Sequence, residues 1–546
     1  MLRVLQECEH VAADFSADPV HDLRVSLRRC RSLADGMIAM DPDRDWKAMK
    51  KAGKRLFQRL GALRDVQVMM EWVEKLHPVP TGVDPGDPPA PPRESGNSES
   101  SAERVPSTEP ATKASGDPAA HLLLEILKSL ETEQKREARA ALDEFDRKQW
   151  RQWGRSLPLR AARIRPGSAV FKHLALERWT TARELHVRAL RNRSQVAFHT
   201  LRIGIKRFRY IVENFLPAEH KAWSDDLKHM QDLLGEVHDL DVLWATALAS
   251  HVFPDEASRK RWHEQIVEER TRRIDEYREK TVGPDSLWNV WRAGLPQGKQ
   301  IEAMATLRMK LWAKALDPDF MHSERVARFA LELYDGLLAT GLMQFANGGE
   351  ARSGLQIAAL LHDVGKSGGN KGHHKTSFEL VRTHSNPLGW KPEYLQRAAI
   401  IARFHAGTLP SRSHKVLRDL LPDEQRITIQ LAAILRLANA FDAAHDCHIL
   451  RVKIENASAG KSRTNGFLRK PVKLPPNQAL VIEAEGFVAG SATAQAVAAE
   501  RYLLETVLRR PVVVKAMKSA GPRRVSLEPK FVVRPPKISS GSERLA

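Results

Sequence analysis

The chain has 546 residues and a formal net charge of +19, from 86 Lys and Arg against 67 Asp and Glu. This length allows two or three domains, and so large a positive excess favours a polyanionic partner: nucleic acid, polyphosphate or an anionic membrane. The longest apolar runs, near 357–361 and 431–435, are too short to span a bilayer, which excludes a membrane-spanning protein.

Cysteine usage and the N-terminal residues indicate a reducing compartment. Cys8, Cys30 and Cys447 are odd in number and follow no metal-binding pattern, so we expect no structural zinc site and interpret each as a small buried apolar residue. The charged residues within the first nine positions show no sign of a secretory signal. The expected location is therefore the cytoplasm.

The first 280 residues are predicted to be helical apart from one insertion. Apolar residues recur there at helical spacing, and Pro and Gly punctuate the segments. The helices are expected over 21–40, 46–60, 121–147, 171–191, 223–234, 240–248 and 255–280, with a further one beginning near residue 199. Gly283-Pro284 follows the last of them and marks the first domain boundary.

One basic helix face occurs twice in this region. Each copy begins with a histidine, and cations follow at helical spacing while apolar residues take the opposite face. The copies are His21, Arg24, Arg28 and Arg31, and then His199, Arg202, Lys206 and Arg209, which begin 199 − 21 = 178 residues apart. A single basic face is most often a solvated surface. A solvated surface has no reason to repeat in register, so the repeat indicates a two-sided anion-binding cradle.

A second repeated segment indicates an internal duplication. Residues 60–66 (Leu-Gly-Ala-Leu-Arg-Asp-Val) are echoed by residues 234–240 (Leu-Gly-Glu-Val-His-Asp-Leu) at an offset of 234 − 60 = 174. Two separate elements that repeat at nearly one offset are typical of duplicated halves. Between the halves, the stretch of about 78–118 holds ten prolines. It cannot bury a core, so we expect a disordered insertion.

These features resemble the CHAD family, the conserved-histidine α-helical domains. The family signature is His-x-x-Arg followed by further basic residues, and it occurs once on each of two pseudo-symmetric four-helix halves. The resemblance covers roughly residues 1–280. It implies that inorganic polyphosphate binds in a basic central groove formed by the two sets of four residues above.

The chemistry of the two faces agrees with this implication. Polyphosphate offers evenly spaced anionic oxygens, and Arg and Lys bind such oxygens through charge-assisted hydrogen bonds. Histidine is only partly charged at neutral pH, so binding should strengthen on acidification. Nucleic acid is the rival partner, but single-strand binding needs stacking aromatics among the cations. Among the two faces only Tyr210 is available, and no base-reading motif is present, so we do not expect specific nucleic-acid binding.

Downstream, an ordered series of short motifs resembles the HD metal-dependent phosphohydrolase superfamily. The match runs from about 303 to 515 and looks most like the C-terminal HD domain of the exopolyphosphatase/guanosine pentaphosphate phosphohydrolase family. The motifs are Met-His322-Ser, His362-Asp363-Val-Gly-Lys366, His373-His374-Lys-Thr-Ser, Arg-Phe-His405 and Leu-Ala-Asn439-Ala-Phe-Asp442.

The resemblance implies a site for a divalent metal, Mn or Mg. The ligands that it implies are His322, His362, Asp363, His374, His405 and Asn439. His373 competes with His374 for one ligand position, and we favour His374 narrowly. Asp363 and Lys366 are the implied catalytic residues: a carboxylate can bridge two metal ions, and a lysine can neutralise charge on a transferring phosphoryl group.

Two departures from the family pattern keep two functions open. Asn439 stands where the family has Asp, so the site loses a charged ligand, although Asp442 lies one helical turn further on. The actin-like domains that carry exopolyphosphatase chemistry in the related family are absent. The chain is either a phosphohydrolase acting on polyphosphate or a phosphorylated nucleotide, or a non-catalytic polyphosphate-binding scaffold or sensor with a degenerate HD pocket.

The predicted fold class is mainly α: a duplicated helical-bundle CHAD domain, then an all-α HD domain with a small C-terminal α+β appendage. Strands are expected over 449–454, 471–474, 479–484 and 512–515, with a helix over 496–508. The expected domain limits are 1–280 for the CHAD-like domain, 281–302 for a linker, 303–448 for the HD-type domain, 449–515 for the appendage and 516–546 for a disordered basic tail.

Overall fold

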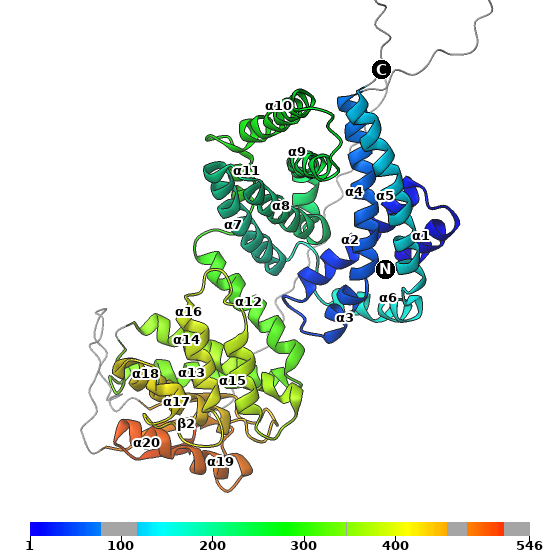
Figure 1. Cartoon of the computed structure of the whole chain (residues 1–546). Helices are drawn as coiled ribbons and strands as arrows, with labels where there is room; N and C mark the ends of the chain where they lie inside the picture. The colour runs from blue at the N-terminus through cyan, green and yellow to red at the C-terminus, as the bar shows by residue number, and fades with distance from the viewer. Residues whose placement is uncertain (78–116, 346, 456–477, 518–546) are drawn as a thin grey trace, which may run out of the picture. The chain divides into compact units, whose positions relative to one another are not determined.

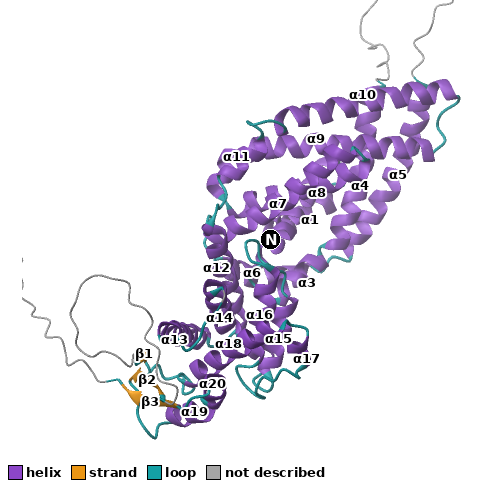
Figure 2. Cartoon of the chain, turned by 90° about the vertical axis from the view of Figure 1, so that its left-hand side faces the viewer, coloured by secondary structure: helices purple, strands orange, loops and turns teal. Residues whose placement is uncertain are grey.

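The computed structural model describes residues 1–77, 117–345, 347–455 and 478–517. These residues are mainly helical, and their strands are confined to a small sheet near the C-terminal end (Figure 2). The predicted fold class is confirmed. The predicted insertion of about 78–118, the predicted strand over 471–474 and the predicted tail from 516 lie outside the described residues, apart from Asp117, Pro118, Ala516 and Met517.

The chain divides into two compact units. The first comprises Met1–Phe320 and Asp363–Gln396, and the second comprises Met321–His362 and Arg397–Ala546. Within the described residues, every helix is too short or too polar to cross a bilayer. The predicted domain limits stay predictions.

The first unit contains twelve described helices up to residue 320. They are α1 Leu2–Ala13, α2 Ala17–Met37, α3 Arg44–Ala52, α4 Lys54–Leu76, α5 Pro118–Asp143, α6 Arg147–Ala161, α7 Ala169–Asn192, α8 Gln195–Phe215, α9 Pro217–Ala249, α10 Glu256–Thr281, α11 Leu287–Ala293 and α12 Lys299–Leu316.

The duplication is visible in how these helices pack. The helices α2, α4 and α5 pack in succession, and so do α8, α9 and α10, while α2 contacts α8 and α4 contacts α9 across the two halves (Figure 1). The apolar faces of α2 and α8 carry Leu23 and Leu27, and Leu201 and Ile205, all fully buried in one hydrophobic core. Because these apolar faces are buried, the basic faces on the opposite sides of α2 and α8 point away from the core.

Three expected helix divisions were wrong. The helix predicted over 496–508 is two helices, Ala492–Glu500 and Tyr502–Leu508. The helix predicted over 46–60 breaks at Gly53, where an added Cβ would lie 3.3 Å from the Trp150 ring, and α4 then continues to Leu76. Conversely, the two helices predicted over 223–234 and 240–248 are one continuous helix, α9. Tertiary packing of α9 overrides the weak helix propensity of Gly235, which lies between the two predicted helices.

The segment Asp363–Gln396 packs with the first unit through buried polar contacts. It contains the 3-10 helix η1, Val364–Gly368, and helix α15, His373–Thr383. Leu388 accepts a hydrogen bond at its carbonyl from the His173 ring (2.8 Å) and donates its N–H to Glu177 (3.0 Å). The same carboxylate pairs with buried Arg308 at 2.6 Å.

The second unit combines helices with a three-stranded sheet. Its elements are α13 Phe320–Ala339, α14 Gly348–Leu361, α16 Pro392–Arg403, α17 Lys415–Arg418, α18 Pro422–Ala440, β1 Arg451–Ile454, β2 Leu480–Glu485, α19 Ala492–Glu500, α20 Tyr502–Leu508 and β3 Val512–Ala516; α13 and α16 begin just inside the first unit. Strand β2 is central, antiparallel to β1 and parallel to β3.

The free cysteines differ from expectation at one position: Cys8 and Cys30 are buried, but Cys447 is exposed.

Asp41 ties α3 to α6 and provides a test of the first unit. Its carboxylate is 6% exposed and accepts hydrogen bonds from Trp46 Nε1 (2.9 Å) and Arg160 Nε (2.7 Å). Burial alone would raise the pKa of Asp41, but the hydrogen bonds from Arg160 and Trp46 outweigh it and hold this pKa below its ordinary value. Asp41 therefore stabilises the fold above about pH 4 and loses that contribution as pH falls through its lowered pKa.

We expect Asp41→Asn to lower the free energy of unfolding by about 2–3 kcal/mol at pH 7, because a buried neutral amide cannot replace the charge-assisted hydrogen bonds that the Asp41 carboxylate accepts from Arg160. Urea unfolding monitored by tryptophan fluorescence measures this. Asp35→Asn is the matched control: Asp35 is exposed and pairs only with Lys50, so its change should stay within about 0.5 kcal/mol. Equal losses in both variants would contradict the assignment.

Candidate functional site

The two basic faces meet at a cavity in the first unit. This cavity has a volume of about 470 Å³, and His21 from α2 lines it together with Arg202 and Lys206 from α8. The opposite walls come from α4 and α9, the helices that carry the second repeated segment. The structure thus brings the N-terminal parts of both predicted faces to one place, which we call the basic groove.

Arg24 does not line this cavity, but it lies at the junction of α2 and α4, where its charge helps to lower the pKa of Lys206 in the groove. Its guanidinium donates to the Gly61 carbonyl (3.2 Å) and lies 3.8 Å from the Asp65 carboxylate. Both partners belong to the first copy of the repeated Leu-Gly segment, which explains why this segment repeats together with the basic face. The Nε–H of Arg202 is buried and has no hydrogen-bond partner among the described residues. A donor in that state favours an anionic ligand.

The electrostatics of the groove reflect crowded positive charge. Burial, followed by repulsion from Arg202, Arg24 and Arg28, lowers the pKa of Lys206 to about 7. Burial also raises the pKa of Asp239 to about 6, although Arg202 and Lys206 oppose that change. At neutral pH the groove therefore holds a lysine that is only partly charged.

The remaining predicted residues of the two faces have other contacts. Arg28 lies over the Tyr210 ring at 5.5 Å and near the groove cations, whereas Arg31 donates to the Lys50 carbonyl at 2.7 Å and lies over the Phe57 ring. Arg209 lies beside Tyr210 and does not line the groove. Arg31 therefore has a packing role at this end of α2.

His199 occupies a different cavity from His21. It lies with His238 in a cavity of about 570 Å³ between α8 and α9, and the two Nδ1 atoms are 3.4 Å apart. Burial first, then Arg202 and His199, lower the pKa of His238 to about 4, so His238 is neutral at pH 7. The two predicted histidines are thus related by sequence but do not face one cavity.

Sequence reasoning missed several groove residues. Arg64, Lys75 and Gln231 also line the cavity. Arg64 stands inside the first repeated segment, immediately before Asp65, so the repeat itself was a signal for it. Lys75 and Gln231 lie outside both motifs, and no sequence pattern marked them.

A histidine cluster lies in the second unit. His322 from α13, His362 at the end of α14 and His405 after α16 are at most 2% exposed. The His362 ring is centred 5.4 Å from the His322 ring and 4.6 Å from the His405 ring. Residues from three helices that are far apart in sequence therefore form one buried cluster.

The hydrogen bonds of the cluster show that Nδ1 carries the proton on each ring. The Nδ1 atoms of His362 and His405 donate to the carbonyls of Ala359 and Ala402, each at 2.7 Å. His322 Nδ1 donates to Asp442 at 2.7 Å. In the rings of His362 and His405, Nε2 therefore carries the lone pair that a metal takes.

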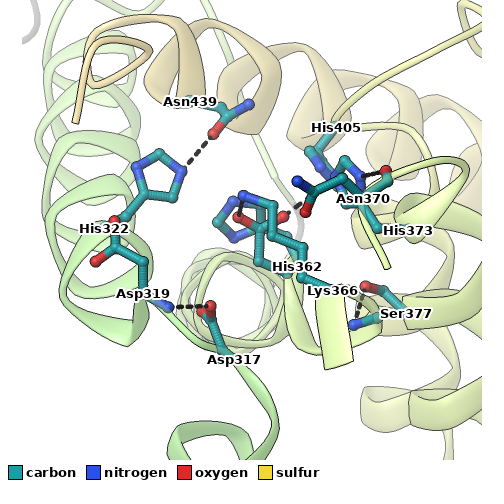
Figure 3. Close-up of polar contacts among 12 residues, drawn as sticks. Asp317, Asp319, His322, His362, Lys366, Asn370, His373, Ser377, His405 and Asn439 are labelled. Atoms are coloured by element: carbon teal, nitrogen blue, oxygen red, sulfur yellow. Dashed lines mark hydrogen bonds and ion pairs between the residues drawn. The ribbon is translucent and has the colours of Figure 1, made fainter. Parts of the chain in front are cut away.

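The position that departs from the family pattern contacts His322 directly. Asn439 Oδ1 lies 2.9 Å from His322 Nε2 (Figure 3). Asp442 also converges on this ring, and Arg325 binds both of its oxygens at 2.9 Å. Burial favours the neutral acid, but the hydrogen bonds from His322 and Arg325 prevail and lower the pKa of Asp442. Asp442 is therefore ionised, and its carboxylate orients the His322 ring.

In the first unit, Asp363 is surrounded by cations. Its carboxylate pairs with Lys366 at 2.6 Å and with His373 at 3.3 Å, and the bond to Asp363 raises the pKa of His373. The narrow preference for His374 differs from this arrangement, because the histidine that pairs with Asp363 is His373. The two are consecutive on α15, so their side chains point in different directions.

Gly365 allows η1 and α15 to approach each other. An added Cβ at this position would lie 2.2 Å from the His373 carbonyl and 2.5 Å from the Ser377 N–H. The Gly365 N–H donates to Ser377 Oγ at 2.8 Å. This close contact holds His373 beside Asp363 and explains why Gly stands between Asp363 and Lys366 in the sequence.

The donor set fits a divalent metal. In the second unit, His322, His362 and His405 are buried, and each ring can offer one nitrogen as a ligand. Asp363 is the next residue in the chain after His362, so the sequence places one carboxylate beside a histidine of the cluster. Imidazole nitrogens and one carboxylate are a common ligand set for first-row divalent ions.

Comparison with known protein families agrees with both halves of this description. Residues 1–248 match the model of the CHAD domain. Residues 309–479 match the model of Ppx/GppA phosphatase, domain III. The protein is therefore a fusion of a CHAD domain with a Ppx/GppA-type domain III, as the sequence motifs predicted. Both domain types point to polyphosphate or other phosphorylated compounds. No curated protein matches the chain.

Proposed function

We propose that the protein binds inorganic polyphosphate in the basic groove. The observation that carries this proposal is the buried Nε–H of Arg202, which has no hydrogen-bond partner in the described part of the chain and lies beside Lys206 in a cavity also lined by His21. Neighbouring cations destabilise one another, and a polyanion relieves that repulsion. Phosphate oxygens accept from guanidinium groups through strong charge-assisted hydrogen bonds.

The groove suits a phosphate chain better than a nucleic acid. Its aromatic residue Trp72 is already covered on its ring by Lys75 at 4.5 Å and by Arg273 at 4.9 Å. A base therefore finds no free ring on which to stack. A chain of bare phosphates needs only the cations.

We expect the combined Arg24→Ala and Arg202→Ala substitutions to weaken polyphosphate binding by about 100-fold, because each removes one charge-assisted contact worth about 1.5–3 kcal/mol. Isothermal titration calorimetry with medium-chain polyphosphate measures the change. Arg151→Ala with Arg191→Ala removes the same two charges from exposed positions outside the groove. That control should change the affinity less than fivefold, and similar losses in both double variants would refute groove binding.

Binding should strengthen as pH falls from 9 to 6. A bound polyanion raises the pKa of Lys206 above about 7 and that of Asp239 above about 6, so each group takes up a proton on binding. For a ligand that favours the protonated form, affinity rises as pH falls toward the pKa of the free protein. Lys206→Arg, which stays charged, should flatten the profile between pH 7 and 9. A profile independent of pH in the wild type would contradict this account.

We further propose that the second site is a metal-dependent phosphohydrolase centre acting on polyphosphate or a phosphorylated nucleotide. His322, His362, His405 and Asp363 would hold the divalent metal, with Asn439 as a neutral neighbour. A bound divalent metal supplies a hydroxide nucleophile and Lewis-acid activation of phosphorus. Asp442 keeps the His322 ring oriented, and the Lys366 ammonium can neutralise charge on the phosphoryl group.

A non-catalytic sensor is the second candidate. Asn439 favours it, because a neutral amide contacts His322 where a carboxylate would add charge to the metal site. In that case the pocket binds a phosphorylated compound through its cations and does not turn it over.

We expect Mn²⁺-dependent release of phosphate from polyphosphate or guanosine tetraphosphate, and loss of at least about 1,000-fold of this activity in His362→Gln. A colorimetric phosphate assay, with circular dichroism to verify folding, measures it. His121→Gln alters an exposed histidine on α5 and should leave the rate unchanged. No bound metal by elemental analysis and no turnover would refute the enzyme and leave the sensor.

A further inference from the structure

A charged residue lies inside the buried apolar run of α18. The apolar residues of 431–437 are 0% exposed, and Arg436 stands among them at only 6% exposure. A guanidinium stays charged at neutral pH, so its burial is costly unless its donors are satisfied. Asn439, which contacts His322, lies three residues further along the same helix. The buried charge is therefore about one helical turn from the histidine cluster.

Arg436 binds the turn that carries His405. Helix α16 ends at Arg403, and His405 follows outside the helix. Arg436 Nη1 donates to the Phe404 carbonyl at 3.3 Å, and Nη2 donates to the Gly407 carbonyl at 2.8 Å. Because a guanidinium holds its donors in a fixed fork, these two bonds fix the backbone on both sides of His405.

The ionic partner of Arg436 is Glu500, the last residue of α19. Its carboxylate accepts hydrogen bonds from Arg436 Nε and from Nη2, the latter at 3.4 Å. The dipole of a helix disfavours a carboxylate at the C-terminal end, so this position depends on the guanidinium that offsets it. Glu500 also lies beyond residue 479, where the match to Ppx/GppA phosphatase, domain III ends. The ion pair therefore connects a segment outside that match to the turn with His405.

Glu500 is held in place because α19 belongs to a packed substructure, formed by the three-stranded sheet with α19 and α20. Both helices pack against α18. On the other side, the Val452 N–H of β1 donates to Glu332 of α13 at 2.8 Å. An added Cβ at Gly336 of α13 would lie 3.0 Å from Ile454 of β1. This substructure thus contacts the helix that carries His322 and, through Arg436, the turn that carries His405.

We propose that Arg436 and Glu500 are positioning residues of the metal site, which fix the His405 ring through the turn around it. The proposal rests on the proposed function, since it requires His405 to be a metal ligand. The bond from His405 Nδ1 to the Ala402 carbonyl sets the rotation of the ring, and the two bonds from Arg436 set the backbone that carries it. Groups that hold a ligand from outside the site commonly change metal affinity by about 10–100-fold.

The test measures Mn²⁺ binding to full-length proteins by isothermal titration calorimetry. Arg436→Lys keeps the positive charge beside Glu500 but loses the forked bonds to the two carbonyls, and Glu500→Ala removes the ionic partner. Each should bind Mn²⁺ at least about tenfold more weakly than the wild type. Glu500→Gln, which keeps an acceptor oxygen for Arg436, should give an intermediate affinity and takes the place of Glu500→Ala if that variant does not fold.

Glu455→Gln is the matched control. It removes the ion pair of Glu455 with Lys515 at 2.8 Å, which joins β3 to the residue after β1, and should leave Mn²⁺ affinity unchanged. Hydrogen–deuterium exchange of the metal-free proteins gives a second readout: exchange of the amides of 404–408 should rise in Arg436→Lys and Glu500→Ala, and stay unchanged in the control.

Wild-type Mn²⁺ affinity in folded Arg436→Lys or Glu500→Ala would overturn the proposal, because the pair would then only stabilise the fold. If His362→Gln loses Mn²⁺ while these variants keep it, the inference alone is refuted. A wild type that binds no Mn²⁺ refutes the proposed metal site together with the inference.

Discussion

Repulsion among buried cations is the constraint on which the first unit depends. The apolar faces of α2 and α8 pack into one core, and this packing places Arg24 and Arg202 near Lys206. This crowding destabilises the charged form of Lys206, so burial and the neighbouring cations lower its pKa to about 7. Asp65 and Asp239 offset part of this charge, and a polyanion would offset the rest. The same core that stabilises the fold thus creates the affinity for phosphate.

Histidine orientation is the corresponding constraint at the second site. Backbone carbonyls fix Nδ1 of His362 and His405, and Asp442 fixes Nδ1 of His322. The His362 and His405 rings so held both present Nε2 with its lone pair, which is the arrangement that metal binding needs. Because Arg325 neutralises Asp442, the carboxylate can stay buried while it orients the ring. Asn439 therefore changes one position of the site, while the hydrogen bonds that orient the three histidine rings remain.

Helical periodicity and the internal repeat were sufficient to predict the fold class and the core of the basic groove. They predicted that Arg24, Arg202 and Lys206 share a function, because residues at repeated spacing in duplicated halves take equivalent places. They could not show that His199 faces another cavity, because a face of a helix is wider than one pocket. Arg31 was included for its spacing alone, although its guanidinium is committed to the Lys50 carbonyl.

The second site was predicted from motif order, and motif order says little about the direction in which each side chain points. His373 and His374 are consecutive, and only the close contact at Gly365 decides which of them meets Asp363. The helices predicted over 223–234 and 240–248 form one helix, because tertiary packing that no sequence pattern shows sustains α9.

The central claim is that the basic groove recognises a phosphate polymer and does more than attract negative charge. Competition binding to the full-length protein, with polyphosphate against heparin and single-stranded DNA at equal charge concentration and physiological salt, tests it most directly. The account predicts that polyphosphate binds at least about tenfold more tightly than either competitor, because phosphate oxygens fit the paired guanidinium donors. Equal affinity for all three polyanions would contradict it.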